Sequence, residues 1–246
     1  MRRPPGDPFR MSVEELIQEV RSRLIAQADP AFREDARKLF REPVDPYGVR
    51  SSQLAEVERY IYGVIKCWPS PQRNRFFNLL WKSGKFEEAT LVCHVYRRFK
   101  RECTACEFGL FERWIDRYVN NWAHCDGVAS WLLAACIENQ PELAGQLARW
   151  TCSPDPWKRR AAAVALLQEA KKGRRTEVIF EVADLLIADS DEMVQKGVGW
   201  LLKEAYPPRP REVVEFLSAH RERASRLLLR YAAEKMSAED KATVLG

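Results

Sequence analysis

Three related segments decide the fold of this chain: Asn121-Trp122-Ala123-His124-Cys125-Asp126, Trp157-Lys158-Arg159-Arg160 and Gln195-Lys196-Gly197-Val198-Gly199-Trp200. Each lies in a stretch with helical spacing, and their tryptophans are 35 and 43 residues apart. A loose period of this length is typical of helix-pair repeats, in which each pair packs only on its neighbours. The recurrence therefore predicts a solenoid of HEAT-like helix pairs rather than a compact bundle.

The hydrophobic pattern outside these segments is also helical. Apolar residues recur at intervals of three and four, as in Leu16, Val20 and Leu24, and no stretch alternates like a β-strand. Ser12 to Glu15 has the form of a capping box, and Pro141 and Pro156 suit the first turns of helices. The pattern predicts helices over 12–28, 31–40, 52–66, 72–82, 85–101, 105–118, 121–138, 141–150, 157–171, 175–188, 191–205, 209–219, 222–235 and 238–245.

These features predict an all-α class: an α-solenoid, or superhelix, of HEAT-like helix pairs with one concave face. The turn-rich stretch 41–51 is short, so we expect one HEAT-like repeat domain over residues 1–246. The inner helices of such a solenoid line one extended face. Residues far apart in the sequence are thus predicted to meet a single long ligand.

The charge of the chain is concentrated. With 40 Lys and Arg against 35 Asp and Glu, the net charge is only +5. Residues 157–175 alone hold seven basic residues and one acidic residue, Glu169. A local excess of this kind indicates an anionic partner such as nucleic acid. We therefore expect the concave face of the solenoid to be a basic, DNA-binding face.

The cysteines favour reduced thiols. Seven is an odd number, and most lie within apolar helical patterns rather than a loop-rich framework. Cys103 and Cys106, with Cys93 and His94 upstream, lack a second ligand pair at zinc-binding spacing, so we expect no metal and no cofactor. The N-terminus has no apolar stretch, and the longest uncharged run is too short to span a bilayer, which predicts a cytoplasmic protein without membrane contact.

Trp122 and Asp126 are four residues apart and share one helical face, with Asn121 or Asn120 as a cap. Spacing alone favours a core tryptophan beside an exposed aspartate. Arg160 follows the start of the next helix, where free N–H groups attract anions and an arginine suits a phosphate. For Lys158 and Arg159, the spacing favours a solvated basic face.

Gly197 and Gly199 are unusual inside a helix. They permit a close approach, either of a ligand to Trp200 or of a neighbouring helix. The sequence leaves both readings open. It lacks phosphate-binding glycine loops, a nucleophile elbow and a zinc-protease motif, and its three histidines leave few general acids or bases.

At the three segments the chain resembles the AlkD-like DNA alkylation repair family of HEAT-like DNA glycosylases. Weaker echoes are Tyr47-Gly48-Val49-Arg50 and Leu229-Arg230-Tyr231-Ala232, and the likeness covers roughly residues 36–235. The resemblance implies a glycosylase that excises positively charged N3- or N7-alkylated purines, such as 3-methyladenine, 7-methylguanine or bulkier adducts, from double-stranded DNA. It also implies that the enzyme grips the sugar–phosphate backbone without flipping the base into a pocket.

The resemblance assigns roles to individual residues. Asp126 resembles the catalytic carboxylate, Trp122 and Trp200 the aromatic walls beside it, and Arg160 the residue that holds the adjacent phosphate. Further DNA contacts are expected from Trp157, Lys158, Arg159 and Lys196. The family likeness reverses the preference for a core Trp122.

Two other functions fit the same residues. A non-catalytic protein that binds damaged or branched DNA needs only the basic and aromatic residues. A helical-repeat scaffold for another protein needs neither, and no obligate protein partner is evident. Of the three functions we expect the DNA glycosylase, and we expect the protein to lie in the bacterial cytoplasm or nucleoid.

Overall fold

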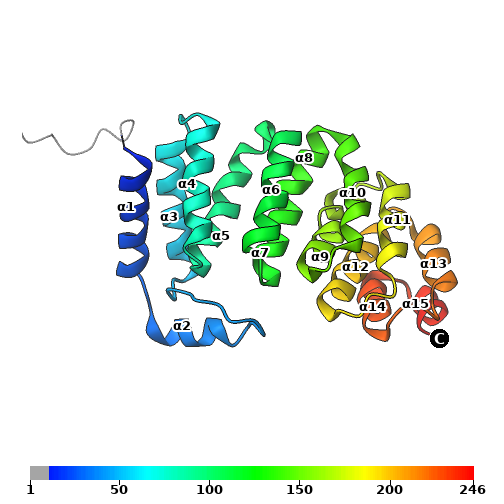
Figure 1. Cartoon of the computed structure of the whole chain (residues 1–246). Helices are drawn as coiled ribbons and strands as arrows, with labels where there is room; N and C mark the ends of the chain where they lie inside the picture. Colours follow the sequence, from blue (N-terminus) through cyan, green and yellow to red (C-terminus); the bar gives the residue numbers. More distant parts are fainter. Residues whose placement is uncertain (1–10) are drawn as a thin grey trace, which may run out of the picture. The chain divides into compact units, whose positions relative to one another are not determined.

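The computed structural model describes residues 11–246, and the regular elements in this range are helices joined by short connections (Figure 1). Within that range there is no β-strand, only an isolated bridge between Asp45 and Lys85. The predicted all-α class is confirmed. No helix in this range is long and apolar enough to cross a membrane.

The chain divides into two compact units, one ending at Phe99 and the other covering Lys100–Gly246. The single repeat domain expected from the sequence stays a prediction. The described helices of the first unit are α1 (Val13–Ala26), α2 (Pro30–Arg37), α3 (Ser51–Ile65), α4 (Ser70–Lys82) and α5 (Phe86–Tyr96). A 3-10 segment, η2 (Arg97–Glu102), follows α5 and contains the boundary between the units.

In the first unit, α1 packs on α3 and α4, and these pack on α5. The predicted capping box starts α1, where Ser12 accepts from the backbone N–H of Glu15 and the Glu15 carboxylate accepts from that of Ser12. The connection before α3 is fixed by a buried carboxylate: Glu87 accepts the backbone N–H groups of Tyr47, Gly48 and Val49 at 2.8, 2.8 and 3.0 Å. The Tyr47 motif is thereby anchored to α5.

The second unit contains more and shorter helices. They are α6 (Ala105–Tyr118), α7 (Trp122–Gly127), α8 (Ala134–Asn139), α9 (Pro156–Val164), α10 (Leu167–Lys171), α11 (Thr176–Leu186), α12 (Glu192–Ala205), α13 (Pro210–Ala219), α14 (Arg226–Ala232) and α15 (Ala238–Leu245). A π-helix, η3 (Val128–Leu133), joins α7 to α8, and 3-10 segments form η4 (Pro141–Cys152) and η5 (Ala233–Lys235).

Several predicted helices differ from those observed. The helix expected over 121–138 contains the π-helical η3, that over 141–150 is the 3-10 segment η4, and that over 157–171 is interrupted between α9 and α10. The start predicted for the helix over 222–235 is wrong. The observed helix α14 begins at Arg226, because the Ser225 side chain caps it by accepting from Leu228 N–H. Apolar spacing alone does not distinguish these variants of helical backbone.

Gly199 allows α12 and α14 to pack closely. A Cβ atom at this position would lie 2.6 Å from the Tyr231 Cβ and 2.9 Å from the Leu228 carbonyl oxygen. Both distances are shorter than normal van der Waals contact. Of the two readings left open for this glycine, helix packing is the one observed.

Candidate functional site

The candidate site lies within the second unit, where α7, α9 and α12 meet. The start of each of these helices is fixed by a side-chain cap: Asn121 accepts from His124 N–H, Asp155 from Trp157 N–H, and Asp191 from the N–H groups of Met193 and Val194. The prediction that Asn121 or Asn120 caps the first helix is confirmed for Asn121. These caps fix where the three helices begin, and so they fix the helical turns on which Trp122, Asp126 and Arg160 lie.

The central contact of the site is a two-point ion pair between α7 and α9. The Nε and one terminal nitrogen of Arg160 donate to the two carboxylate oxygens of Asp126, each at 2.8 Å. The second terminal nitrogen donates to the carbonyl oxygen of Met193 at the start of α12. The Arg160 guanidinium thus joins all three helices.

Burial separates the two partners. The side chain of Arg160 is 6 % exposed, whereas that of Asp126 is 17 % exposed. Burial lowers the pKa of Arg160, but the hydrogen bond and the charge of Asp126 outweigh it, so the net pKa is raised. Arg160 is therefore a permanent cation held behind a carboxylate that still reaches solvent.

Gly197 provides the space for this arginine. A Cβ atom on Gly197 would lie 3.2 Å from the Arg160 Cγ and 3.5 Å from one of its terminal nitrogens. The first of these distances is tighter than ordinary contact. Gly197 therefore makes room for a neighbouring side chain, just as Gly199 makes room for a neighbouring helix.

The two predicted aromatic walls differ in exposure. Trp122 is 38 % exposed, and so is not the core tryptophan that spacing alone favoured. Trp200 is partly exposed, and its indole N–H donates to Glu204 at 3.2 Å. Glu204 in turn accepts from Lys235. Glu204 was missed at the sequence level, although its position one helical turn after Trp200 is a recognisable signal.

The remaining predicted DNA-contact residues differ in burial and in ion pairing. Trp157 is buried, and its carbonyl oxygen accepts from the Cys125 thiol. Lys158 pairs with Glu112 and Asp116. Lys196 is partly exposed and forms no ion pair with any residue in 11–246.

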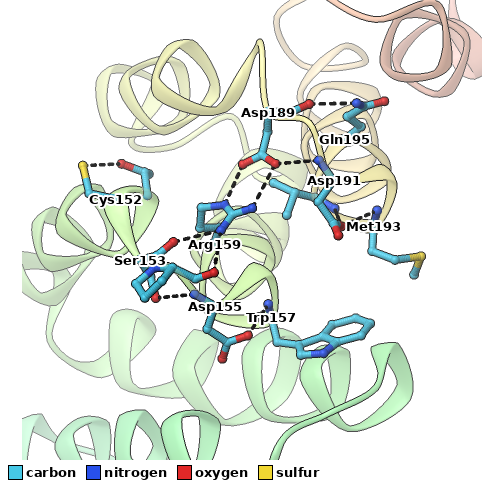
Figure 2. A network of polar contacts seen from close by, with 12 residues as sticks. Cys152, Ser153, Asp155, Trp157, Arg159, Asp189, Asp191, Met193 and Gln195 are labelled. Carbon is cyan, nitrogen blue, oxygen red and sulfur yellow. Dashed lines mark hydrogen bonds and ion pairs between the residues drawn. The ribbon is translucent and has the colours of Figure 1, made fainter. Parts of the chain in front are cut away.

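Arg159 belongs to a structural network that ties the loop before α9 to the loop before α12. Figure 2 shows its guanidinium between Asp189 and the backbone of Ser153; it donates to both Asp189 oxygens, at 2.7 and 3.1 Å, and to the Ser153 carbonyl at 2.8 Å. The Asp191 N–H also donates to Asp189. This network aligns the starts of the two helices that carry Arg160 and Met193.

The basic window 157–175 is largely neutralised by contacts with acidic side chains. Ion pairs join Lys158 to Asp116, Arg159 to Asp189, Arg160 to Asp126, Lys172 to Glu138, and Arg174 and Arg175 to Glu169. Most of these carboxylates are distant in sequence, so the count of charges along the chain could not reveal them. Lys171 is the one basic residue of the window without an ion pair among the described residues.

His124 is held in a contact with Asn121, and the cysteines are free thiols. His124 is buried, and its Nδ1 lies 2.9 Å from the Asn121 amide nitrogen, which can only donate. All seven cysteines lie in the described part of the chain and are free thiols, with Cys103 buried and Cys106 exposed. Among residues 11–246, no group of three or more His, Cys, Asp or Glu side chains is placed to hold a metal ion.

A cavity of about 590 Å³ in the second unit is lined by Arg175, Phe180 and Arg209, among others. None of the predicted catalytic residues borders it. Asp126 thus lies on an accessible helical face rather than in this cavity.

The family model described as DNA alkylation repair enzyme matches residues 20–236. Among solved structures, a predicted DNA alkylation repair enzyme from Enterococcus faecalis has a TM-score of 0.78 at 13 % identity, covering 86 % of this chain and 98 % of that one. No match is found among curated proteins.

A second solved structure is an alkylpurine DNA glycosylase, AlkC, from Pseudomonas fluorescens, bound to DNA that contains an abasic site analog. It has a TM-score of 0.55 at 17 % identity, covering 99 % of this chain and 69 % of that one. These likenesses confirm the predicted solenoid class of helical repeats. Because the family model spans most of the sequence, this chain belongs to the DNA alkylation repair enzyme family.

Proposed function

We propose that this protein is a DNA glycosylase that hydrolyses the N-glycosidic bond of N3- or N7-alkylated purines in double-stranded DNA. One observation carries the proposal: the Asp126 carboxylate is held by Arg160 on an accessible face of α7, one turn from the exposed Trp122. Family membership and the AlkC structure with abasic-site DNA support the same reaction.

The chemistry requires no general acid. A purine alkylated at N3 or N7 carries a positive charge, so it leaves as a neutral base when the bond to C1′ breaks and the bonding electrons pass to the ring nitrogen. Positive charge then develops on the deoxyribose. A carboxylate placed beside the sugar stabilises that charge more in the transition state than in the ground state, which is the condition for catalysis.

Asp126 has the hydrogen-bonding capacity for this role. Each of its oxygens accepts one hydrogen bond from Arg160, and a carboxylate oxygen has a second lone-pair direction. The outer lone pairs can accept from the water that attacks C1′. That water adds its oxygen to C1′ and releases its proton to the carboxylate or to solvent.

Arg160 has two proposed roles. The family resemblance gives it the phosphate next to the lesion, and that role stays a prediction. The ion pair supports a further role, which is to fix the orientation of Asp126. Such positioning contributes to rate because it keeps the carboxylate in register with the sugar.

Trp122 and Trp200 are proposed to flank the sugar. An aromatic face attracts a cation by about 1 kcal/mol. The bond from the Trp200 indole to Glu204 restricts its ring, and Lys196, one turn before it on α12, is the cation best placed to contact a phosphate. Lys158 and Arg159 have acidic partners, so we assign them smaller contributions.

We propose that the alkylated base stays outside any protein pocket. Most glycosylases rotate the base into an enclosed site. Here the candidate carboxylate does not border the 590 Å³ cavity, and an open site would accept bulky adducts. A complex with lesion DNA in which side chains enclose the modified base would overturn this part of the proposal.

The test is release of the base from DNA that carries defined 3-methyladenine, 7-methylguanine or bulkier adducts, identified by mass spectrometry. We expect the wild-type protein to release the base. Asp126→Asn should lower the single-turnover rate about 100-fold or more while the Kd for DNA changes little, because one charge-stabilising group typically contributes this much. Asp116→Asn, an exposed aspartate of α6, is the matched control and should retain the rate.

The outcomes separate the alternatives. An undiminished rate in Asp126→Asn would remove this residue from the mechanism. Tight binding of lesion DNA without release of any base would favour a non-catalytic damage-binding protein. Absence of DNA binding at low salt would favour a protein scaffold.

A further inference from the structure

The accessible face of α7 and η3 extends beyond the proposed site. Over residues 121–137 every position is buried except Trp122, Ala123, Asp126, Ser130 and Trp131. Trp131 is 36 % exposed, nearly as much as Trp122. The accessible positions form one stripe with an exposed tryptophan at each end and Asp126 between them.

The π-helix explains why Trp131 belongs to this stripe. In an α-helix, a residue five positions after Asp126 is rotated by about 140° from it, because each residue turns about 100°. A π-helix closes its turn with i to i+5 hydrogen bonds, so across such a turn residues five apart are rotated less from one another than in an α-helix. Trp131 lies within η3, and Ser130 Oγ donates to the Asp126 carbonyl oxygen at 2.7 Å across the same turn.

The opposite side of η3 is fixed by packing. Val128, Ala129, Leu132 and Leu133 are fully buried, and η3 contacts α6 and α9. The widened turn therefore cannot rotate freely, and its accessible side stays with Asp126. π-Helical turns are rare and are frequent at functional sites, where they redirect a side chain.

We propose that Trp131 is a further DNA-contact residue whose ring packs on a deoxyribose next to the lesion, which extends the aromatic surface of the site from Trp122 past Asp126. The inference rests on the proposed function. The two tryptophans are nine positions apart, which is about 13 Å along a helix, whereas a DNA strand advances about 3.4 Å per nucleotide. A stripe of this length contacts more than one nucleotide.

DNA is the partner that this stripe fits. A face for another protein would be expected to have an apolar centre with polar residues around it. Here the centre is the Asp126 carboxylate, and the aromatic rings lie at the two ends. In proteins that bind single-stranded nucleic acid, aromatic rings spaced along the binding surface hold successive nucleotides without reading their sequence.

The first test is direct contact, by 19F NMR of the full chain containing 5-fluorotryptophan. Trp131→Phe assigns the resonance of this residue. The probe is a duplex with an abasic-site analog, and an undamaged duplex of the same sequence is the comparison. We expect the Trp131 resonance to shift with the abasic duplex and to shift less with the undamaged one.

The second test is affinity. Trp131→Ala should raise the Kd for the abasic duplex about fivefold, which is the lower end of the range for loss of an aromatic ring stacked on a base, because the proposed contact is to a sugar. Trp131→Phe should recover most of the affinity. Leu185→Ala is the matched control because Leu185 is also an exposed large apolar residue, 53 % exposed, but lies on α11.

The outcomes distinguish this inference from the proposed function. Base release with an unmoved Trp131 resonance and an unchanged Kd in Trp131→Ala would overturn the role of Trp131 and leave the glycosylase intact. A shifted resonance and weaker binding in Trp131→Ala, in a wild-type protein that releases no base, would keep the DNA contact and reject the glycosylase. Equal losses in Trp131→Ala and Leu185→Ala would also overturn the inference.

Discussion

The two units hold their carboxylates in contrasting ways. In the first, Glu87 is 3 % exposed and accepts three backbone N–H groups, while Glu88 is fully buried and accepts from Arg21 and the Tyr47 hydroxyl. In the second, Asp126 is held by one arginine and its side chain is 17 % exposed. A saturated, buried carboxylate stabilises the fold, whereas a carboxylate held from behind can act on a ligand.

Tyr47, which donates its hydroxyl hydrogen to Glu88, belongs with the structural carboxylates of the first unit. Burial raises the pKa of its hydroxyl, and the hydrogen bond to Glu88 raises it further. The phenol therefore stays protonated and continues to donate to Glu88. The Tyr47 motif is explained as an anchor of the connection before α3, without any ligand.

The largest effect on stability is predicted for Glu87→Ala. It leaves the buried N–H groups of Tyr47, Gly48 and Val49 without their acceptor, and each costs about 1–3 kcal/mol. We expect urea unfolding to show a loss of about 4 kcal/mol. Glu87→Gln should lose less, because its remaining oxygen can still accept.

This variant also sharpens the contrast with Asp126. At a temperature where Glu87→Ala remains folded, the rate of base release should change far less than in Asp126→Asn. A Glu87→Ala protein with full stability, or with a rate as low as that of Asp126→Asn, would break the distinction between structural and functional carboxylates.

An intermediate effect is predicted from two helical glycines, one in each unit. A Cβ atom on Gly63 in α3 would meet no neighbouring atom within 4 Å, so Gly63→Ala should stabilise the protein by about 0.5–1 kcal/mol through helix propensity. Gly197→Ala should gain nothing, because its Cβ would press on Arg160. Thermal unfolding and single-turnover base release measure the two changes.

Gly197→Ala should also lower the rate of base release several-fold by displacing Arg160 relative to Asp126, since a misplacement of about 1 Å can cost about 100-fold and the shift needed here is smaller. Gly63→Ala should leave the rate unchanged. If Gly197→Ala is as stabilising and as active as Gly63→Ala, then the close fit of Arg160 against α12 has no functional meaning.

The smallest effect concerns pH and the support of Trp200. Burial raises the pKa of Glu204, but the hydrogen bond and charge of Lys235 outweigh it, so the net pKa is lowered from 4.5. A carboxyl whose pKa is lower in the folded state stabilises the protein above its unfolded pKa and loses that contribution as pH falls through its folded pKa. Wild type should therefore lose this contribution below about pH 4.5.

Glu204→Gln removes the charge but keeps an acceptor for the Trp200 indole. We expect it to be less stable than wild type at pH 7, with the difference shrinking as urea unfolding is repeated towards pH 3. A difference that stays constant with pH would show that the Glu204 charge contributes nothing. Glu204→Leu should in addition shift the fluorescence of Trp200.

Local sequence patterns predicted much of the fold. Apolar spacing predicted most helices to within a few residues, and Ser12, Asn121 and Pro156 marked starts that the structure confirms. The patterns failed where the backbone leaves the α-helix, as in η3 and η4, because the buried residues of these segments, such as Val128 and Leu132 in η3, still lie three and four positions apart. The start of α14 was predicted at residue 222, three residues before the Ser225 that caps it, although a serine at that place is a recognisable cap.

The sequence by itself determined the all-α class, the family and the helical face shared by Trp122 and Asp126, because these depend on residues close together in the chain. Only the tertiary structure decided which charges remain available. It paired Arg160 with Asp126, Arg159 with Asp189 and Lys158 with Asp116, across 30 to 42 positions of sequence. The physical reason is that ion pairing depends on distances of a few ångströms between helices, and helix packing sets those distances.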